Sequence, residues 1–441
     1  MLLDELKAIV RESGVVGAGG AGFPSYAKMT DKADTVILNC VECEPLLKLH
    51  KQLLAAYAQE IVQMLDEIRE TLGAKEAVIG IKNEHAGTIR ILEEVIRDYP
   101  KVRICAVRPT YPMGDEVVLI YEATGRVIKP GGIPIDENVI VYNAETVYNM
   151  YKGVHEKAPV TNKLVSIVGA VAKPITIRIP LGATVKDAVR AAGGVTVKNP
   201  AYVMGGPMMG HLGTERTVIT KTTNAVIVLP EEHKVVMRMK KNLDIERRRA
   251  ASSCCQCRTC TEMCPRHALG HPIEPHRIMR AVANQDTSDL SVYTNAAYCS
   301  SCGLCENYSC PQGLSPRSVI AEFKDGLRGA GIRPQKLEPA PVAEDRELKK
   351  VPVPRLKAKL GLTEYDVPAP FEDTEIETFC VKVLMSQHIG APAVPSVRQG
   401  EPVKKGQKIA EAAEGLSVAI HASIDGTVEK ANDKEIVIKR K

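Results

Sequence analysis

The chain has 441 residues, of which 44% are hydrophobic and 25% are charged, and its formal net charge is +5. This length exceeds one ordinary hydrophobic core, and the composition is that of a folded protein, so we expect about two to four domains. The small net charge argues against nucleic acid as the main partner. No apolar run approaches the ~18–20 residues of a membrane-spanning helix, and Met1–Glu12 lacks a signal-peptide core. We therefore expect a cytoplasmic protein.

The first predicted elements are a short helix over Leu2–Ser13 and a glycine-rich loop over Gly14–Pro24. The loop contains the spacing G-x-G-x-x-G, but a Rossmann turn requires a strand before this motif, and here a helix precedes it. Its bare backbone amides can still approach a phosphate or a flat ring closely. The density of glycines exceeds what a simple turn needs, which favours a ligand-binding loop.

Strand-like and helix-like segments then alternate as far as residue 143. The predicted strands are Thr35–Asn39, Glu76–Lys82, Val102–Arg108 and Val139–Asn143, and the predicted helices are Leu47–Leu72, His85–Asp98 and Gly114–Thr124. This alternation predicts a parallel α/β sheet with a ligand beyond the carboxyl ends of its strands. Polar residues follow three of these strands, although each one alone is equally compatible with a turn or a helix cap.

A second region begins at Leu164 with an apolar strand that extends to Val171. A second strand over Ile175–Ile179, a helix after Thr184 and a glycine-rich segment over Met204–Gly210 follow. We interpret the methionines of this segment as core or interface residues.

Thirteen cysteines are present, and nine of them lie between positions 254 and 310. In a reducing compartment such clustering indicates metal binding. The first run is C-x2-C-x2-C-x3-C-P, and the second has one more residue in its last gap. In two-cluster ferredoxins the fourth cysteine of each run ligates the other cluster. We therefore assign one four-iron cluster to Cys254, Cys257, Cys260 and Cys310, and another to Cys299, Cys302, Cys305 and Cys264.

The alternative is a pair of zinc sites, but zinc motifs generally pair a C-x2-C with a distant second one. Cys255 is expected to be no ligand. Cys40 and Cys43 form a C-x2-C without a second pair nearby, and we expect them to line or underlie a pocket. We expect Cys105 and Cys380 to be buried thiols.

Four segments resemble the flavin and NADH site of complex I and, more closely, the RnfC family of NADH-oxidising subunits. They are Gly17–Pro24 with Lys28, Asn39–Pro45, Tyr111–Glu116 and Tyr142–Thr146. The domain order is most similar to the soluble RnfC-like NADH:acceptor oxidoreductases. These include PduS-type cobalamin reductases, the electron-transfer protein of proline reductase and the RnfC-type subunit of methylenetetrahydrofolate reductase.

The resemblance implies a set of cofactor-binding residues. Those implied for FMN are Gly17, Gly19, Gly20, Gly22, Lys28, Asn39, Glu42, Tyr111, Gly114, Asp115, Asn143 and Thr146. Those implied for NADH are Phe23, Glu44 and Glu116. Complex I has an aspartate where this chain has Val41, so we expect flavin hydrogen bonding or nucleotide affinity to differ.

The same resemblance implies a multidomain α/β protein. Its parts are a parallel α/β FMN/NADH-binding domain (1–160), a ubiquitin-like SLBB domain (161–235), an α-helical ferredoxin-type domain with two [4Fe-4S] clusters (236–330), a linker (331–372) and a β barrel-sandwich module (373–441). The module is similar to lipoyl carriers, but the expected hairpin tip, Glu414–Ser417, has no lysine, so we do not expect lipoylation.

The implied function is hydride transfer from NADH to FMN, followed by single-electron transfer through the clusters to a protein-bound or small-molecule acceptor. A corrinoid is the first expectation for this acceptor. The alternatives are an electron-input subunit of methylenetetrahydrofolate or proline reductase, and a non-catalytic iron–sulfur relay. We expect membership of a complex or oligomer, and an anaerobic setting in the cytoplasm or in a bacterial microcompartment.

Overall fold

A four-stranded parallel sheet forms the centre of the N-terminal part, in the order β3-β2-β1-β5. Its strands are β1 (Thr35–Asn39), β2 (Glu76–Lys82), β3 (Val102–Val107) and β5 (Val139–Asn143). The structure is a computed structural model that describes residues 1–440. Both faces of the sheet are buried: Val36 and Leu38 of β1 contact one hydrophobic cluster, and Ile37 contacts another on the opposite face. Burial on both faces explains why the strands are almost continuously apolar.

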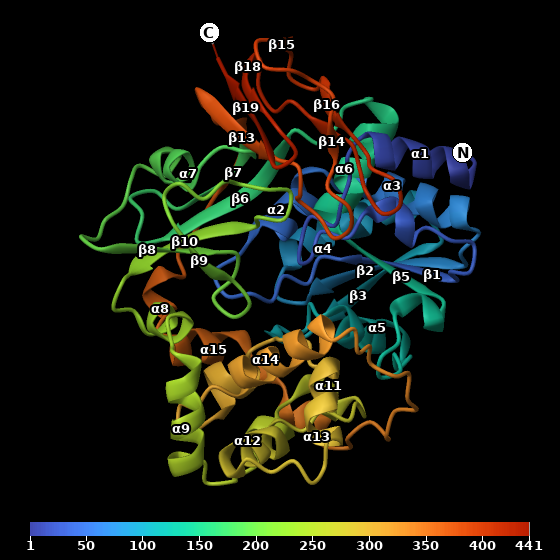
Figure 1. Ribbon diagram of the computed structural model, residues 1–441. Coiled ribbons are helices and arrows are strands. Elements are labelled where there is room, and N and C mark those ends of the chain that lie inside the picture. Colours follow the sequence, from blue (N-terminus) through green and yellow to red (C-terminus); the bar gives the residue numbers. More distant parts are fainter. Residues whose placement is uncertain (441) are drawn as a thin grey trace.

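Helices cover the two faces of this sheet (Figure 1). They are α1 (Leu3–Glu12), α2 (Leu49–Ala56), α3 (Ala58–Leu72), α4 (Ala86–Val95), α5 (Glu116–Thr124) and α6 (Ala144–His155). The predicted helix Leu47–Leu72 is broken at Tyr57, whose φ of −129° and ψ of 41° are not helical. The Tyr57 ring centroid lies 4.5 Å from the Tyr148 ring centroid, so the break coincides with an aromatic contact to α6. Helix α5 begins two residues later than predicted because Asp115 caps it, accepting hydrogen bonds from Val117 and Val118 N–H.

A six-stranded mixed sheet follows, in the order β12-β7-β6-β10-β8-β9. Its strands are β6 (Asn162–Gly169), β7 (Ile175–Pro180), β8 (Pro200–Met204), β9 (His211–Gly213), β10 (Ala225–Pro230) and β12 (Phe371–Glu375). Helix α7 (Val185–Ala191) starts with a capping box between Thr184 and Asp187. Strand β12 therefore joins this sheet from a much later part of the chain.

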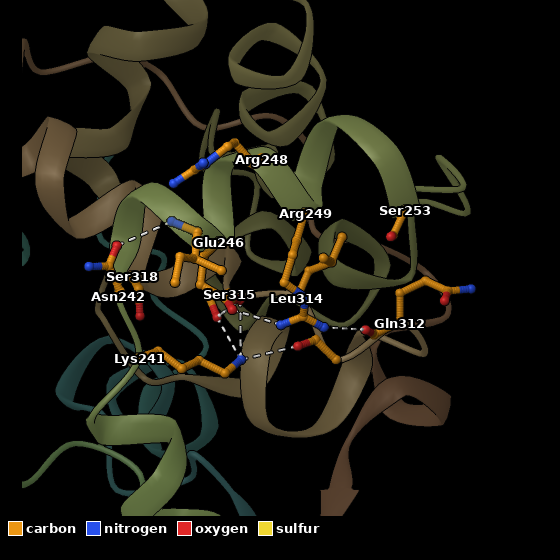
Figure 2. Close-up of polar contacts among 12 residues, drawn as sticks. Lys241, Asn242, Glu246, Arg248, Arg249, Ser253, Gln312, Leu314, Ser315 and Ser318 are labelled. Atoms are coloured by element: carbon orange, nitrogen blue, oxygen red, sulfur yellow. Dashed lines mark hydrogen bonds and ion pairs between the residues drawn. The ribbon is translucent and has the colours of Figure 1, made fainter.

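The cysteine-rich part is helical and lies at the lower end of the molecule in Figure 1. Its helices are α8 (Lys234–Met239), α9 (Leu243–Ser253), α10 (Thr259–Glu262), α11 (Pro265–Ala268), α12 (Pro275–Asn284), α13 (Ser291–Thr294) and α14 (Pro316–Gly329). Figure 2 shows how the start of α9 is fixed: the Ser315 hydroxyl lies 2.6 Å from Glu246 and 2.8 Å from Lys241 Nζ. Arg249 pairs with Glu246 at 2.7 Å, so part of the arginine run is compensated locally.

The segment 331–372, for which the sequence predicts a linker, contains regular structure. Strand β11 (Val351–Pro352) pairs with β4 (Thr110–Tyr111), and helix α15 (Val353–Leu360) follows. Leu356 and Leu360 of α15 are buried in one cluster with Val235 and Val236 of α8. This stretch therefore lies against both the N-terminal domain and the start of the helical part.

The C-terminal module consists of a four-stranded and a three-stranded sheet. Its strands are β13 (Cys380–Leu384), β14 (Val394–Pro395), β15 (Pro402–Val403), β16 (Lys408–Glu411), β17 (Ile420–His421), β18 (Gly426–Ala431) and β19 (Glu435–Lys439). The module shares one hydrophobic cluster with the six-stranded sheet, in which Val383 and Ile436 join Ile177 and Val228. It also reaches the N-terminus, because Arg11 of α1 donates to the Ala413 carbonyl at 2.8 Å. No helix in residues 1–440 is long and apolar enough to cross a membrane.

Candidate functional site

The carboxyl ends of β1 and β5 carry two asparagines side by side, because Asn39 and Asn143 are register partners in the sheet. The Asn39 amide donates to the Gly114 carbonyl at 2.9 Å, and its oxygen accepts from Val41 N–H at 3.0 Å. Asn143 caps α6 by accepting from Glu145 N–H at 3.0 Å. These amides join the loops that surround this end of the sheet, where the sequence predicts a ligand.

The glycine loop lies over the same end of the sheet. Gly17 N–H donates to the Phe23 carbonyl at 2.9 Å, and Ala18 N–H donates to the Thr146 hydroxyl at 2.9 Å. Gly20 has a φ of +80°, and a Cβ at this position would meet nothing within 4 Å. The loop is therefore closed at its base and open at its tip, as a cradle for a flat ring or a phosphate would be.

Residues from the domain of the six-stranded sheet lie against this loop. A Cβ at Gly19 would lie 3.3 Å from the Asn224 amide nitrogen, and one at Gly22 would lie 2.7 Å from the Thr222 methyl group. The Asn224 amide oxygen is buried and has no hydrogen-bond partner within residues 1–440. Sequence reasoning missed Asn224, because only the fold brings this segment to a loop two hundred residues earlier. Lys28, which the sequence predicts here, donates to the Val141 carbonyl at 3.2 Å.

Two buried polar groups face each other beside Asn143. Burial raises the pKa of Glu42 to about 7, and its Oε2 accepts from His50 N–H at 3.3 Å. Burial lowers the pKa of His50 to about 3, so its imidazole is neutral. Glu42 Oε1 and His50 Nε2 have no hydrogen-bond partner in the described chain. Buried polar atoms normally have partners, so these orphaned atoms fit a polar ligand such as FMN. His50 carried no motif that would have identified it.

The three residues predicted for NADH occupy different surroundings. Glu44 is held by Met208 N–H, which donates to its Oε2 at 3.0 Å, and burial raises its pKa to about 7. Glu44 Oε1 lacks a partner within residues 1–440. Phe23 is half-buried in the glycine loop, and Glu116 is exposed at the first position of α5.

Two residues predicted to close the flavin pocket make polar contacts with the cysteine-rich part. The Tyr111 hydroxyl donates to the Cys302 carbonyl at 2.6 Å. Asp115 accepts from Arg266 Nη2 at 2.9 and 2.8 Å through its two oxygens. The first contact is buried and the second is partly buried. They fix the flavin-domain loop 111–115 to the Cys302 backbone and to the Arg266 side chain, two residues after Cys264.

The eight predicted cluster ligands lie in two groups of four. We call Cys264, Cys299, Cys302 and Cys305 the inner quartet, and Cys254, Cys257, Cys260 and Cys310 the outer quartet. The outer four line one cavity. In the inner quartet, burial raises the pKa of Cys302 to about 12, and the nearby thiols of Cys264 and Cys299 raise it further. In each group, the fourth cysteine of one run lies with the first three of the other.

The chemistry of the two quartets fits iron–sulfur clusters. Burial raises the pKa of Cys260 to about 12, and the neighbouring thiols of the outer quartet add to the effect. Four mutually repelling thiolates become favourable when a cationic metal centre binds them. Of the remaining cysteines, Cys255 is exposed and lines the same cavity as the outer quartet, Cys40 is buried, and Cys43, Cys105 and Cys380 are half-buried.

Comparison with protein families agrees with this layout. The Nuo51 FMN-binding domain family matches residues 10–152 and the SLBB domain family matches residues 164–211. The 4Fe-4S dicluster domain family matches residues 253–315, and the RnfC barrel sandwich hybrid domain family matches residues 369–441. The expected fold class, a multidomain α/β protein with these parts, is therefore confirmed, as is the presence of an FMN-binding and an iron–sulfur domain.

Three curated proteins illustrate the relationship. The cobalamin reductase PduS of Citrobacter freundii is 38% identical over 436 residues, covering 98% of this chain and 95% of that protein. The cobalamin reductase PduS of Salmonella typhimurium is 38% identical over 440 residues, covering 99% and 97%. One component of the Na⁺-translocating ferredoxin:NAD⁺ oxidoreductase complex of Acetobacterium woodii is 28% identical over 271 residues, covering 60% and 58%. The predicted resemblance is confirmed: this chain is an RnfC-like flavin and iron–sulfur oxidoreductase that belongs to the PduS cobalamin reductase family.

Proposed function

We propose that this chain takes electrons from NADH, passes them through FMN and two [4Fe-4S] clusters, and delivers them to a corrinoid. The observation that carries the proposal is the direct connection between the two cofactor sites, made by Tyr111 with Cys302 and by Asp115 with Arg266. A nucleotide site joined by these contacts to the inner cysteine quartet is suited to pass electrons to it. The similarity to PduS over nearly the whole length supports a corrinoid as the acceptor.

The residues at the end of the parallel sheet would hold FMN. We assign it Gly17, Gly19, Gly20, Gly22, Lys28, Asn39, Glu42, Gly114, Asn143 and Thr146, with Tyr111 and Asp115 at the edge towards the cysteines. When bound, FMN supplies the exchange between two-electron hydride chemistry and one-electron transfer. Glycines let the backbone approach the ligand, the asparagines fix the surrounding loops, and neutral His50 contributes an imidazole without adding charge.

NADH would bind beside this site, with Phe23, Glu44 and Glu116 facing it. The uncharged Val41 is buried, so no acidic side chain at that position contributes to the flavin or nucleotide site. The inner and outer quartets would each hold one [4Fe-4S] cluster, with the ligands crossed between the two runs as in two-cluster ferredoxins.

A second candidate function is that of an electron-input component in a larger reductase. The similarity to a component of a ferredoxin:NAD⁺ oxidoreductase complex, over 60% of this chain, favours it. The two functions differ in the acceptor and not in the path, so the acceptor must be tested separately. We place either activity in the cytoplasm or in a bacterial microcompartment.

The first test is an anaerobic titration of the purified protein with NADH, monitored by the visible absorbance spectrum. Iron and released FMN are quantified on the same sample. About eight irons and one FMN per chain are expected from two four-iron clusters and one flavin site. Bleaching of both flavin and iron–sulfur absorbance supports the path. Iron without FMN and without any response to NADH would leave only the cluster relay. Reduction of cob(II)alamin by the protein alone then separates the corrinoid reductase from the component of a larger enzyme.

A further inference from the structure

The two quartets differ in their connection to the flavin domain. Cys302 and Cys305 of the inner quartet are each only 8% exposed. In the outer quartet Cys257 is exposed, as is its neighbour Cys255. The inner quartet thus has two buried and two half-buried cysteines, whereas the outer quartet has one exposed and three half-buried cysteines.

The inner quartet is fixed to the flavin site through a short series of contacts. Asn39 holds the Gly114 carbonyl at 2.9 Å, and Asp115 follows Gly114 in the chain. Asp115 binds Arg266 at 2.8 Å, and Arg266 lies two residues after Cys264 of the inner quartet. Arg266 is the only cation paired with Asp115 in the described residues. The guanidinium therefore spans the boundary between the domains, where the Arg266 and Asp115 side chains are only 15% and 13% exposed.

A second, independent contact reaches the same quartet. The Tyr111 hydroxyl donates to the Cys302 carbonyl at 2.6 Å, and both residues lie in one buried hydrophobic cluster. Tyr111, Pro112 and Met113 also line one cavity together with Cys264 and Leu304. Mainly apolar side chains therefore separate the flavin-domain loop from the inner quartet.

The outer quartet has no such connection. Across residues 1–440, no hydrogen bond or ion pair joins residues 254–260 to residues 1–160. The cavity lined by the outer cysteines is instead bordered by Gln256, Arg258, His276 and Gln312 of the helical part. The outer quartet is linked to the inner one by the short chain segment from Cys260 to Cys264. Cys264 N–H donates to the Thr261 carbonyl at 2.9 Å, which places Cys264 one helical turn after Cys260.

We propose that electrons from the flavin site reach the inner quartet first and leave for the acceptor from the outer quartet, and that Arg266 is the positioning residue that holds the inner quartet against the flavin domain. This order rests on the proposed function. Electron tunnelling falls steeply with distance, so the quartet fixed to the flavin domain receives electrons before the quartet beyond it. The balance is one NADH oxidised to NAD⁺ and H⁺ for two one-electron reductions, one at each quartet.

The order is tested with one cysteine variant in each quartet, using EPR of the remaining cluster after addition of NADH or dithionite. In Cys257→Ala, NADH should still reduce the inner cluster, while reduction of cob(II)alamin is lost. In Cys302→Ala, NADH should no longer reduce the outer cluster, although dithionite does. The reverse pattern would overturn the order. Cys255→Ala, in neither quartet, is the control and should retain both signals. Failure of NADH to reduce either cluster in the wild type would instead refute the proposed function.

The role of Arg266 is tested by the rate of NADH-driven cluster reduction in a stopped-flow experiment. Arg266→Gln should lower this rate about tenfold or more, equivalent to ~1.4 kcal/mol in the barrier, with iron content and the dithionite-reduced EPR spectrum unchanged. Arg266→Lys should recover part of the rate. An unchanged rate in Arg266→Gln would overturn the assignment.

Two further variants serve as a control and as an alternative to Arg266→Gln. Arg277→Gln removes an exposed arginine that pairs with Glu274 and Asp289 in the same helical part, and it should behave as wild type. If Arg266→Gln loses its clusters, Asp115→Asn removes the same ion pair from the other side while keeping a side chain that caps α5. A normal rate of cluster reduction in Asp115→Asn would then contradict the proposed role.

Discussion

The carbonyl oxygen of Val41 occupies the space where a side chain at position 114 would begin: a Cβ built on Gly114 would lie 2.1 Å from it. The same glycine offers its own carbonyl to Asn39 at 2.9 Å. The loops after β1 and β4 therefore touch backbone to backbone, and the sequence can have only glycine at this contact without a shift of one loop.

Gly114→Ala should consequently loosen the flavin site. We expect a loss of about 1–3 kcal/mol in the free energy of unfolding, the usual cost of overpacking a buried contact, together with loss of FMN. Urea unfolding and flavin released per chain are the measurements. Gly87→Ala is the matched control, because Gly87 is exposed at the start of α4 and a Cβ there meets nothing within 4 Å. FMN binding at the wild-type level in Gly114→Ala would show that this contact is not needed.

Glu44 should make stability depend on pH. Burial raises the pKa of Glu44 from the ordinary 4.5 to about 7, so the folded chain keeps a proton that the unfolded chain has lost. This contribution to stability is complete below pH 4.5 and is lost as the pH rises to 7. The free energy of unfolding should fall by roughly 3 kcal/mol across this pH range, because each unit of pKa shift corresponds to about 1.4 kcal/mol.

Glu44→Gln keeps an acceptor for Met208 N–H but has no proton to lose. The stability of the variant relative to wild type should therefore increase as the pH rises from 4.5 to about 7 and stay constant above that, because Glu44 has a pKa of about 7 in the folded chain. Urea unfolding of FMN-free protein across this range is the measurement, with exposed Glu364→Gln as the control. Parallel pH profiles for wild type and Glu44→Gln would contradict the expectation.

Lys221 joins the glycine loop to the C-terminal module. Its ammonium group donates to the Gly14 carbonyl at 2.6 Å and to the Ala419 carbonyl at 3.3 Å, and burial lowers its pKa to about 7. Lys221→Met leaves both carbonyls without this donor. We therefore expect the free energy of unfolding to fall by about 1–3 kcal/mol and FMN binding to weaken. Fluorescence titration with FMN is the measurement, and exposed Lys404→Met is the control. An unchanged affinity would mean that the module does not support the loop.

Cys40 and Cys43 should carry no iron. Cys43 lies against Gly114, 3.1 Å from where its Cβ would be, and Cys40 is fully buried in the core of the N-terminal domain. The double variant Cys40→Ala/Cys43→Ala is expected to retain all of its iron and acid-labile sulfide. A fall in the iron content per chain relative to wild type would instead identify them as ligands.

The sequence predicted the parallel sheet well, because its strands are short apolar runs that end in polar residues, as β1 does at Asn39 and β5 at Asn143. It predicted helix ends less well. The break at Tyr57 coincides with an aromatic contact to Tyr148, and α5 starts where Asp115 caps it. The stretch 331–372 reads as a linker from its prolines and charges, but burial of Leu356 against α8 arises only in the folded chain.

Only those parts of the candidate site that contain a local sequence motif could be predicted. Cysteine spacing led to both quartets, and the glycine loop led to the cradle. The contacts of Asp115 with Arg266, and of Gly22 with Thr222, join residues more than a hundred positions apart. No local pattern encodes such pairs. His50 and Asn224 were missed for the same reason.

The closure of the glycine loop by Lys221 and the Ala419 carbonyl has a consequence for biosynthesis. A ribosome that has released only the N-terminal domain exposes a loop whose supports have not yet been translated. The N-terminal domain can form its sheet at that stage, since all four strands lie before residue 144. Lys221 and Ala419 can contact the glycine loop only after translation has passed them, when β17 has left the exit tunnel. We therefore expect tight capture of FMN to be a late event in the maturation of this chain, and we expect a product truncated after the N-terminal domain to form its sheet without retaining FMN.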